Sequence, residues 1–190
     1  MKKNWRHYLW IVSGLYLMLG LFNILFAWLG LICFFTPLLI SVIKGNKSYC
    51  NHYCGRGQLF DMLGNRLKLS SKKNIPPFLR SKWFRYGFLI FFLIQFVTMI
   101  VNVYLVFNGS SGLHKNITLL WSIKLPWAWA YYDIGLPLWV SQFAFGFYSV
   151  MMTSTLLGLL TMIFFKPRSW CVYCPMGTMT QTICRLKHRR

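Results

Sequence analysis

Long apolar runs alternate with short basic segments along the chain. Residues 8–43 are apolar almost without break, and residues 87–107 and 138–165 form two further runs. A helix rises about 1.5 Å per residue and a bilayer core is about 30 Å thick, so each later run predicts one membrane-spanning helix. A single helix over residues 8–43 would be about 54 Å long. This run therefore predicts two shorter spans with a turn between Asn23 and Gly30; one tilted helix plus a re-entrant piece is the alternative.

The basic residues lie at the ends of these runs, on one side of the predicted membrane. The chain has 190 residues, with 21 Lys and Arg against two acids. All but two of the basic residues fall at the N-terminus, in residues 44–86 or after residue 165. Cytoplasmic segments are enriched in Lys and Arg, so these three segments are expected in the cytoplasm, which requires an even number of crossings. Because the charge follows the span ends, we expect no nucleic-acid binding.

The predicted elements form a repeat. Residues 1–86 and residues 87–190 each contain two spans, then a cysteine pair, then a basic amphipathic segment. The expected fold is an all-α integral membrane protein with four transmembrane helices in two hairpins. Such repeats are related by an axis along the membrane normal, so the two cysteine pairs can converge at the cytoplasmic face. The first amphipathic segment predicts a short interfacial helix. Its apolar positions are Leu59, Phe60, Leu63, Leu67 and Leu69.

Two closely spaced cysteine pairs carry the candidate chemistry. Cys50 and Cys54 follow the second predicted span, and Cys171 and Cys174 follow the fourth. Pairs at this spacing on a cytoplasmic face favour metal binding or redox chemistry over a structural disulfide. Four thiolates suit an iron–sulfur cluster or a closed zinc site. The sequence therefore predicts one metal centre shared by the two pairs.

Cations and glycines beside the pairs favour the cluster. A cluster bound by four thiolates is anionic, and Arg56 and Arg168 are placed to stabilise it. Gly57 and Gly177 leave room for the backbone to approach the sulfurs and offer N–H donors. We expect these four residues to surround the metal centre.

Two other side chains are alternative ligands. His52 lies between the cysteines of the first pair, and Cys184 lies on the C-terminal tail. The simpler interpretation is a solvated or hydrogen-bonded histidine and a packed cysteine. Cys33 lies within a predicted span, where we expect a small buried hydrophobe.

Aromatic residues crowd the predicted outer segment, residues 108–137. The first interpretation is an aromatic belt at the membrane interface. The second is one wall of a quinone-binding crevice, which aromatic residues alone do not establish. The residues concerned are Trp121, Trp127, Trp129, Tyr131, Tyr132 and Trp139.

The cysteine motifs resemble those of a known family. The stretch from Cys50 to Cys54, and the stretch from Cys171 through Cys174 to Pro175, are similar to paired Cys-x-x-x-Cys-Pro motifs. These motifs mark the membrane ferredoxin-type 4Fe–4S proteins of nitrate and nitrous-oxide reductase systems, the NapH/NosR-like family. The first copy has Gly55 where the family has proline, and the second has one residue fewer between its cysteines. The stretch Ile75-Pro76-Pro77-Phe78-Leu79-Arg80 also resembles the family's approach to its third span.

The resemblance implies a 4Fe–4S cluster bound by the two cysteine pairs, in a bacterial cytoplasmic membrane with both termini in the cytoplasm. Many members of the family continue into a soluble ferredoxin-like domain, whereas this chain ends at Arg190, so we expect a minimal membrane unit that needs a partner. Electrons would pass between a quinone pool or membrane partner and a redox partner protein. A multi-subunit complex and a homo-oligomer both stay open.

The spans hold no constellation of acid, base and nucleophile. We therefore expect an electron carrier, or a subunit of an oxidoreductase complex, rather than a stand-alone catalyst. Two alternatives remain. One is a membrane thiol–disulfide oxidoreductase that uses Cys171 and Cys174. The other is a zinc-stapled structural or assembly factor.

Overall fold

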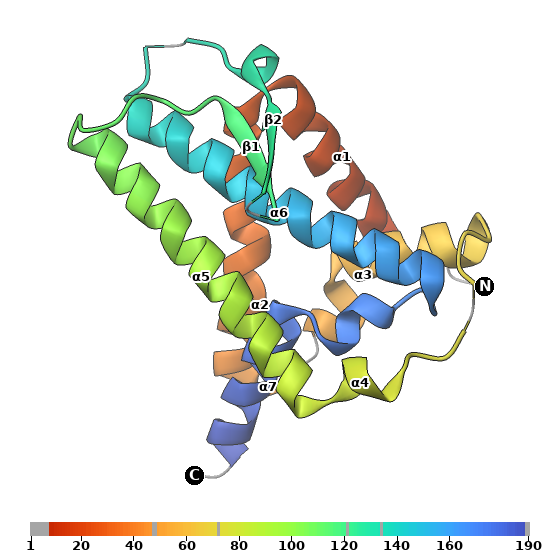
Figure 1. Ribbon diagram of the computed structural model, residues 1–190. Helices are drawn as coiled ribbons and strands as arrows, with labels where there is room; N and C mark the ends of the chain where they lie inside the picture. The colour runs from red at the N-terminus through yellow and green to blue at the C-terminus, as the bar shows by residue number, and fades with distance from the viewer. Residues whose placement is uncertain (1–7, 47–48, 72, 121, 134, 189–190) are drawn as a thin grey trace. The chain divides into compact units, whose positions relative to one another are not determined.

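The computed structural model describes residues 8–46, 49–71, 73–120, 122–133 and 135–188, and it is mostly helical. Figure 1 shows the order of the elements along the chain. The helices are α1 (Leu9–Phe22), α2 (Gly30–Lys44), α3 (Gly55–Asp61), α4 (Pro77–Arg80), α5 (Lys82–Phe107), α6 (Leu138–Phe164) and α7 (Pro175–His188). Short 3-10 turns lie at Ile24–Leu29, Ala128–Ala130 and Ser169–Val172, and π turns at Tyr49–Tyr53 and Met62–Arg66.

Within the described residues, three helical segments are long and apolar enough to cross a membrane. They are Ile24–Lys44 with 21 residues, α5 with 26 and α6 with 27. The preceding helix α1 is apolar but has 14 residues, which corresponds to about 21 Å. Helix α1 ends at Phe22, and Asn23 separates it from the next helical segment, within the region where a turn was expected. The Asn23 side chain accepts a hydrogen bond from the Leu25 N–H at 3.0 Å and so caps the following turn. Four spans in two repeated hairpins remain a prediction.

The described residues fall into two compact units, and each unit draws on both predicted halves of the chain. We call the first the cysteine unit, because all six cysteines lie in it, and the second the hairpin unit. The cysteine unit comprises Met1–Gly14, Cys33–Ile90 and Thr155–Arg190, and the hairpin unit comprises Leu15–Ile32 and Phe91–Ser154.

An aromatic core holds the cysteine unit together. Phe60 of α3 is fully buried, and Trp170 and Tyr173 are each 3% exposed. The ring of Phe88 on α5 meets the Tyr173 ring edge-on, with centroids 5.2 Å apart. Gly158 of α6 makes room for Phe60, because a Cβ at position 158 would lie 2.4 Å from Phe60 Cζ. This core ties the segment that follows the first cysteine pair to the segment that carries the second.

The amphipathic segment after the first cysteine pair is helical only as far as Arg66, so Leu67 and Leu69 lie beyond the helix that we expected. Phe60 is buried, and Leu63 packs against the same core. Leu67 and Leu69 are 59% and 50% exposed. The expectation of an interfacial helix therefore needs correction at Phe60 and Leu63, because these side chains contact protein.

The expectation of an all-helical chain also needs one correction, within residues 108–137. Here β1 (Asn116–Leu119) and β2 (Ile123–Pro126) form an antiparallel hairpin in which Asn116 pairs with Pro126. Ile117 and Leu119 point into the core of the hairpin unit, and their strand neighbours are more exposed, which gives the alternation of a half-buried strand.

The aromatic residues near this hairpin do not act alike. Trp127 is buried in the core of the hairpin unit, which differs from the aromatic belt that we expected. Trp129 and Tyr132 are exposed. Tyr131 lies beneath the Lys115 ammonium, whose Nζ is 4.3 Å from the ring centroid. Trp121 lies outside the described residues.

We predict that Gly158→Ala destabilises the protein by about 1–3 kcal/mol, because the added methyl group overpacks against Phe60. Gly87→Ala on α5 is the matched control, since no atom lies within 4 Å of a Cβ there. Thermal unfolding of both variants in detergent measures the difference. Equal melting temperatures for the two variants would contradict the close packing of α6 on α3.

Candidate metal centre

The two cysteine motifs adopt the same local arrangement, a turn that leads into a helix. Cys50 lies in the π turn before α3, and Cys54 is the residue that precedes α3. Cys171 lies in the 3-10 turn before α7, and Cys174 immediately precedes Pro175, the first residue of α7. Proline suits this first helical position because its missing N–H has no partner there anyway. The second cysteine of each pair therefore lies at a helix N-terminus, where free N–H groups favour a negatively charged sulfur.

Position 55 has no room for a side chain. A Cβ at Gly55 would lie 2.5 Å from the Ser13 hydroxyl oxygen and 3.0 Å from the Leu9 carbonyl oxygen, both on α1. Helix α3 thus begins in direct contact with α1, and no side chain fits between them.

One cysteine of each pair, Cys54 and Cys171, approaches Gly57, although the two are far apart in the sequence. If position 57 had a Cβ, that atom would lie 3.8 Å from the Cys54 sulfur and 3.7 Å from the Cys171 sulfur. These two sulfurs therefore border one small volume that a side chain at position 57 would enter. Cys50 and Cys174 both act electrostatically on Cys171 as well. The fold thus brings the four predicted ligands into one region of the cysteine unit.

All six cysteines are free thiols. Among the residues that the structure describes, no three His, Cys, Asp or Glu side chains are arranged so that they could hold a metal ion as they stand. Four cysteine thiols are the donor set that would hold an iron–sulfur cluster, which would supply one-electron chemistry there. The all-thiol donor set, with the Cys54 and Cys171 sulfurs both near Gly57, fits such a group.

Desolvation of the sulfurs keeps these thiols neutral in the absence of a metal, although the Cys171 residue keeps an exposed edge. Desolvation, followed by the nearby thiols, raises the pKa of Cys171 to about 12. Desolvation also raises the pKa of Cys54 to about 11 and raises that of Cys174. Buried thiolates become stable only with a compensating positive charge. Bound iron ions supply such charge, and metal binding deprotonates the thiols.

Backbone and side-chain donors point at the same sulfurs. The Gly57 N–H donates to Cys54, and the N–H groups of Gly177 and Met176 donate to Cys174. The Trp170 side chain also donates to Cys174. Each of these contacts lowers the pKa of its thiol and favours the charged sulfur that a metal requires.

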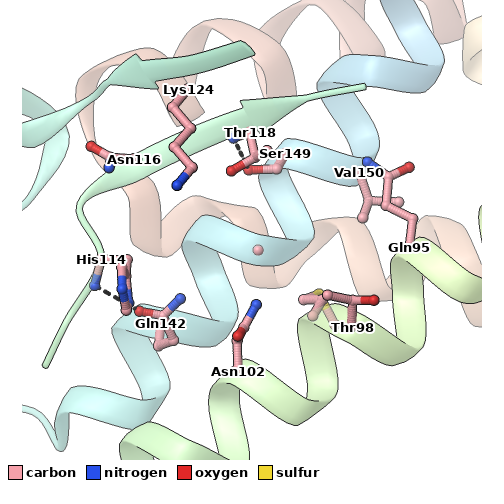
Figure 2. A pocket seen from close by; sticks show the side chains of 12 residues that line it. Gln95, Thr98, Asn102, His114, Asn116, Thr118, Lys124, Gln142, Ser149 and Val150 are labelled. Atoms are coloured by element: carbon pink, nitrogen blue, oxygen red, sulfur yellow. Dashed lines mark hydrogen bonds between the residues drawn. The ribbon is translucent and has the colours of Figure 1, made fainter. Parts of the chain in front are cut away.

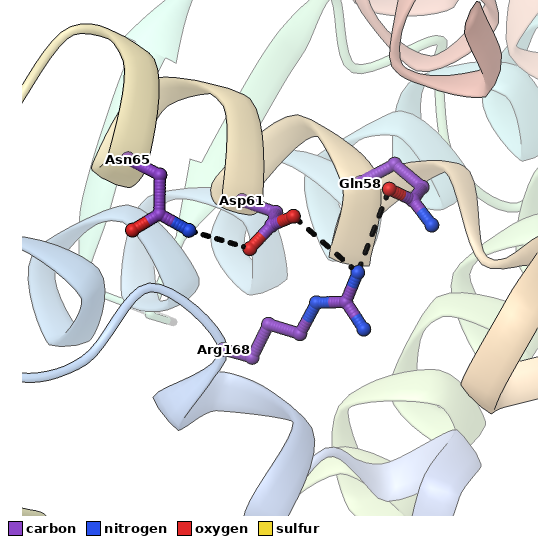
Figure 3. Close-up of polar contacts among 4 residues, drawn as sticks. All are labelled: Gln58, Asp61, Asn65 and Arg168. Atoms are coloured by element: carbon purple, nitrogen blue, oxygen red, sulfur yellow. Dashed lines mark hydrogen bonds and ion pairs between the residues drawn. The ribbon is translucent and has the colours of Figure 1, made fainter. Parts of the chain in front are cut away.

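Two arginines add positive charge. Arg56 lowers the pKa of Cys54 and Cys174, and Arg168 lowers that of Cys171. Figure 3 shows how Arg168 is held: its Nη2 lies 3.5 Å from Asp61 Oδ2 and 3.5 Å from Gln58 Oε1. This ion pair is partly exposed, so its contribution to stability is small. Its effect is to hold the guanidinium near the second cysteine pair.

The alternative ligands have other surroundings. His52 is exposed, with its ring edge toward Tyr53. Cys184 is buried, and its sulfur lies 3.3 Å from the Ser41 hydroxyl. Cys33 is exposed, so the expectation of a buried side chain is wrong. The Cys33 sulfur lies 3.8 Å from the hydroxyl of Tyr49.

Sequence reasoning missed two neighbours of the first pair. Burial and then Cys33 raise the pKa of Tyr49, on which Cys50 and Cys54 also act. Thr180 of α7 places its hydroxyl 3.8 Å from the Cys50 sulfur. Tyr49 could have been noted as the residue before Cys50, whereas nothing in the sequence marks Thr180.

Comparison with known proteins gives one match. A family model described as a 4Fe–4S binding domain matches residues 26–76 and 148–190, just under half of the chain. The two matched segments contain the Cys50/Cys54 pair and the Cys171/Cys174 pair, respectively. No curated protein and no solved structure matches the chain significantly. The match supports an iron–sulfur-binding family and, with it, an iron–sulfur cluster as the cofactor of this chain.

Proposed function

We propose that this chain is a membrane-bound electron-transfer protein of the NapH/NosR-like kind. In this proposal Cys50, Cys54, Cys171 and Cys174 bind one 4Fe–4S cluster. The observation that carries it is the approach of the Cys54 and Cys171 sulfurs to the same side of one glycine, Gly57. The family match to a 4Fe–4S binding domain supports the choice of cluster.

The residues around the thiols would stabilise negative charge at the cluster. A bound iron–sulfur cluster accepts and releases single electrons. The N–H groups at the starts of α3 and α7 favour negative charge on the sulfurs, and Arg56 and Arg168 favour the more negative, reduced state. Cys171 is exposed, so it offers an edge from which a redox partner protein can exchange electrons.

Membrane placement is part of the proposal. The apolar segments Ile24–Lys44, α5 and α6 support insertion in a membrane, with α1 as a fourth, shorter crossing. The excess of Lys and Arg around both cysteine motifs supports a cytoplasmic centre and cytoplasmic termini. Electrons would then pass between a quinone pool or membrane partner and a redox partner protein at the cytoplasmic surface.

Metal analysis of cysteine variants tests the ligand set. The full chain, purified anaerobically, should contain about four iron and four sulfide ions and should give an EPR signal after reduction. Serine at any one of the four ligand positions should remove most of the iron and change that signal. Cys184→Ser is the matched control and should keep both, because Cys184 packs against Ser41. Stoichiometric zinc without iron would contradict the proposal and favour a zinc-stapled structural factor.

Removal of the cation beside Cys171 should change the redox potential. Arg168→Gln should lower the reduction potential of the cluster, because the reduced state gains negative charge and loses a nearby guanidinium. Arg66→Gln, an exposed arginine of the same unit, is the control. Redox titration followed by EPR measures both. An equal shift in the two variants would mean that only net charge matters, and the assigned role of Arg168 would fail.

The raised thiol pKa values oppose the thiol–disulfide oxidoreductase alternative, whose attacking cysteine needs a depressed pKa. In the metal-free protein, alkylation of Cys171 by iodoacetamide should accelerate about tenfold per pH unit between about pH 8 and pH 10, because its pKa of about 12 lies above this range. Peptide mass spectrometry measures the rate. A plateau below pH 8 would instead indicate a reactive thiolate.

A further inference from the structure

A polar cavity of about 260 Å³ lies within the hairpin unit. Figure 2 shows its walls, which come from α5, from α6 and from the segment that contains the β-hairpin. A water molecule occupies about 30 Å³ of liquid, so the cavity has room for a small molecule or for the headgroup of a larger one. No cysteine lines it, and nothing in the proposed electron transfer uses it.

The charge of the lining favours an anion. No carboxylate contributes to it, because the chain's two acids, Asp61 and Asp133, lie elsewhere. Lys124 of β2 and His114 are the ionisable groups of the lining. Figure 2 shows the Lys124 side chain extending from the hairpin into the space between the hairpin and α5. The Asn102 amide extends from α5 into the same space. A cation in this cavity would find no negative counter-charge.

One buried group in the cavity indicates that its ligand carries a proton donor. Gln95 of α5 is only 5% exposed and lines the cavity. Its Oε1 has no hydrogen-bond partner among the described residues. Buried amide oxygens nearly always have a donor, so a ligand with a hydroxyl group would satisfy this atom.

The walls are held in place before any ligand arrives. The backbone N–H of His114 donates to Gln142 Oε1 at 2.9 Å, and the backbone N–H of Thr118 donates to Ser149 Oγ at 3.1 Å. Both contacts tie the hairpin segment to α6. A Cβ at Gly146 of α6 would lie 2.3 Å from a Met99 side-chain carbon of α5, so this glycine lets the two helices approach closely.

The lining does not suit the ring and tail of a quinone. Its apolar side chains are Met99 and Val150, and it contains no Phe, Tyr or Trp. The buried aromatic residue of this segment, Trp127, packs in the core instead. Cofactor sites for large apolar molecules are lined mainly by apolar and aromatic side chains, whereas this cavity is lined mainly by amides and hydroxyls.

We propose that this cavity binds a small oxygen anion that also carries a hydroxyl group. Hydrogen phosphate and the headgroup of phosphatidylglycerol share this chemistry. Lys124 pairs with the anionic oxygen, Asn102 donates to it, and Gln95 Oε1 accepts from the hydroxyl. The site does not depend on the cluster, so Lys124→Gln should leave the iron content and the EPR signal unchanged.

Binding measurements on the purified full chain in neutral detergent test the site. Sodium phosphate, by calorimetry, and phosphatidylglycerol against phosphatidylcholine, by native mass spectrometry, are the two probes. Saturable binding of phosphate identifies a soluble ligand, and binding of phosphatidylglycerol alone identifies a lipid headgroup. Lys124→Gln should weaken the observed binding about tenfold or more, because a charge-assisted hydrogen bond is lost. Gln95→Leu should weaken it as well.

Lys115→Gln is the matched control, because this lysine lies on the same segment but packs over the Tyr131 ring and does not line the cavity. It should bind as the unchanged protein does. Asn102→Leu gives an independent test should the Lys124 variant fail to remain monodisperse. Absence of saturable binding of both probes, or equal weakening by Lys115→Gln and Lys124→Gln, would overturn the proposal.

Discussion

The cysteine unit depends on one electrostatic constraint: its partly desolvated thiols do not carry charge without a positive partner. Desolvation raises the pKa of Cys54, Cys171 and Cys174, and neighbouring thiols raise the pKa of Cys54 and Cys171 further. Backbone N–H groups and two arginines oppose this effect only in part. A polynuclear iron centre removes it, because iron ions supply positive charge at the sulfurs themselves. The metal and the fold of this unit are therefore expected to stabilise each other.

Local packing explains how two distant motifs reach the same place. Gly55 lets α3 begin against α1, Gly57 leaves the volume between the Cys54 and Cys171 sulfurs open, and Gly158 admits Phe60 beneath the second motif. At Gly55 and Gly158 a Cβ would lie where another atom already lies. The glycines thus set the geometry of the centre more directly than the weak ion pair between Arg168 and Asp61.

The sequence predicted the parts of the structure whose signals are long or repeated. Hydropathy over twenty or more residues located α5 and α6, and the two cysteine pairs marked the two segments whose Cys54 and Cys171 sulfurs approach Gly57. The β-hairpin was missed because each strand has four residues, which is too short for a period of two to stand out. Thr180 could not be predicted as a neighbour of Cys50, because that contact depends on how α7 packs. The exposure of Cys33 depends on helix rotation, which an apolar span does not fix.

The cysteine unit and the hairpin unit use polar groups in different ways. In the cysteine unit, polar groups surround thiols and favour negative charge on sulfur. In the hairpin unit, amides, hydroxyls and one lysine line a cavity that lacks any acid. The strong basic excess of the chain is consistent with anionic partners for both, a thiolate-bound cluster in one and a small oxygen anion in the other.

X-ray absorption spectroscopy at the iron edge, on anaerobically purified protein, tests the central claim most directly. The account predicts a first shell of sulfur alone and a second shell of neighbouring iron atoms, as expected when four cysteine thiolates and inorganic sulfide hold a polynuclear cluster. A first shell that contains nitrogen or oxygen, or an iron without iron neighbours, would contradict it.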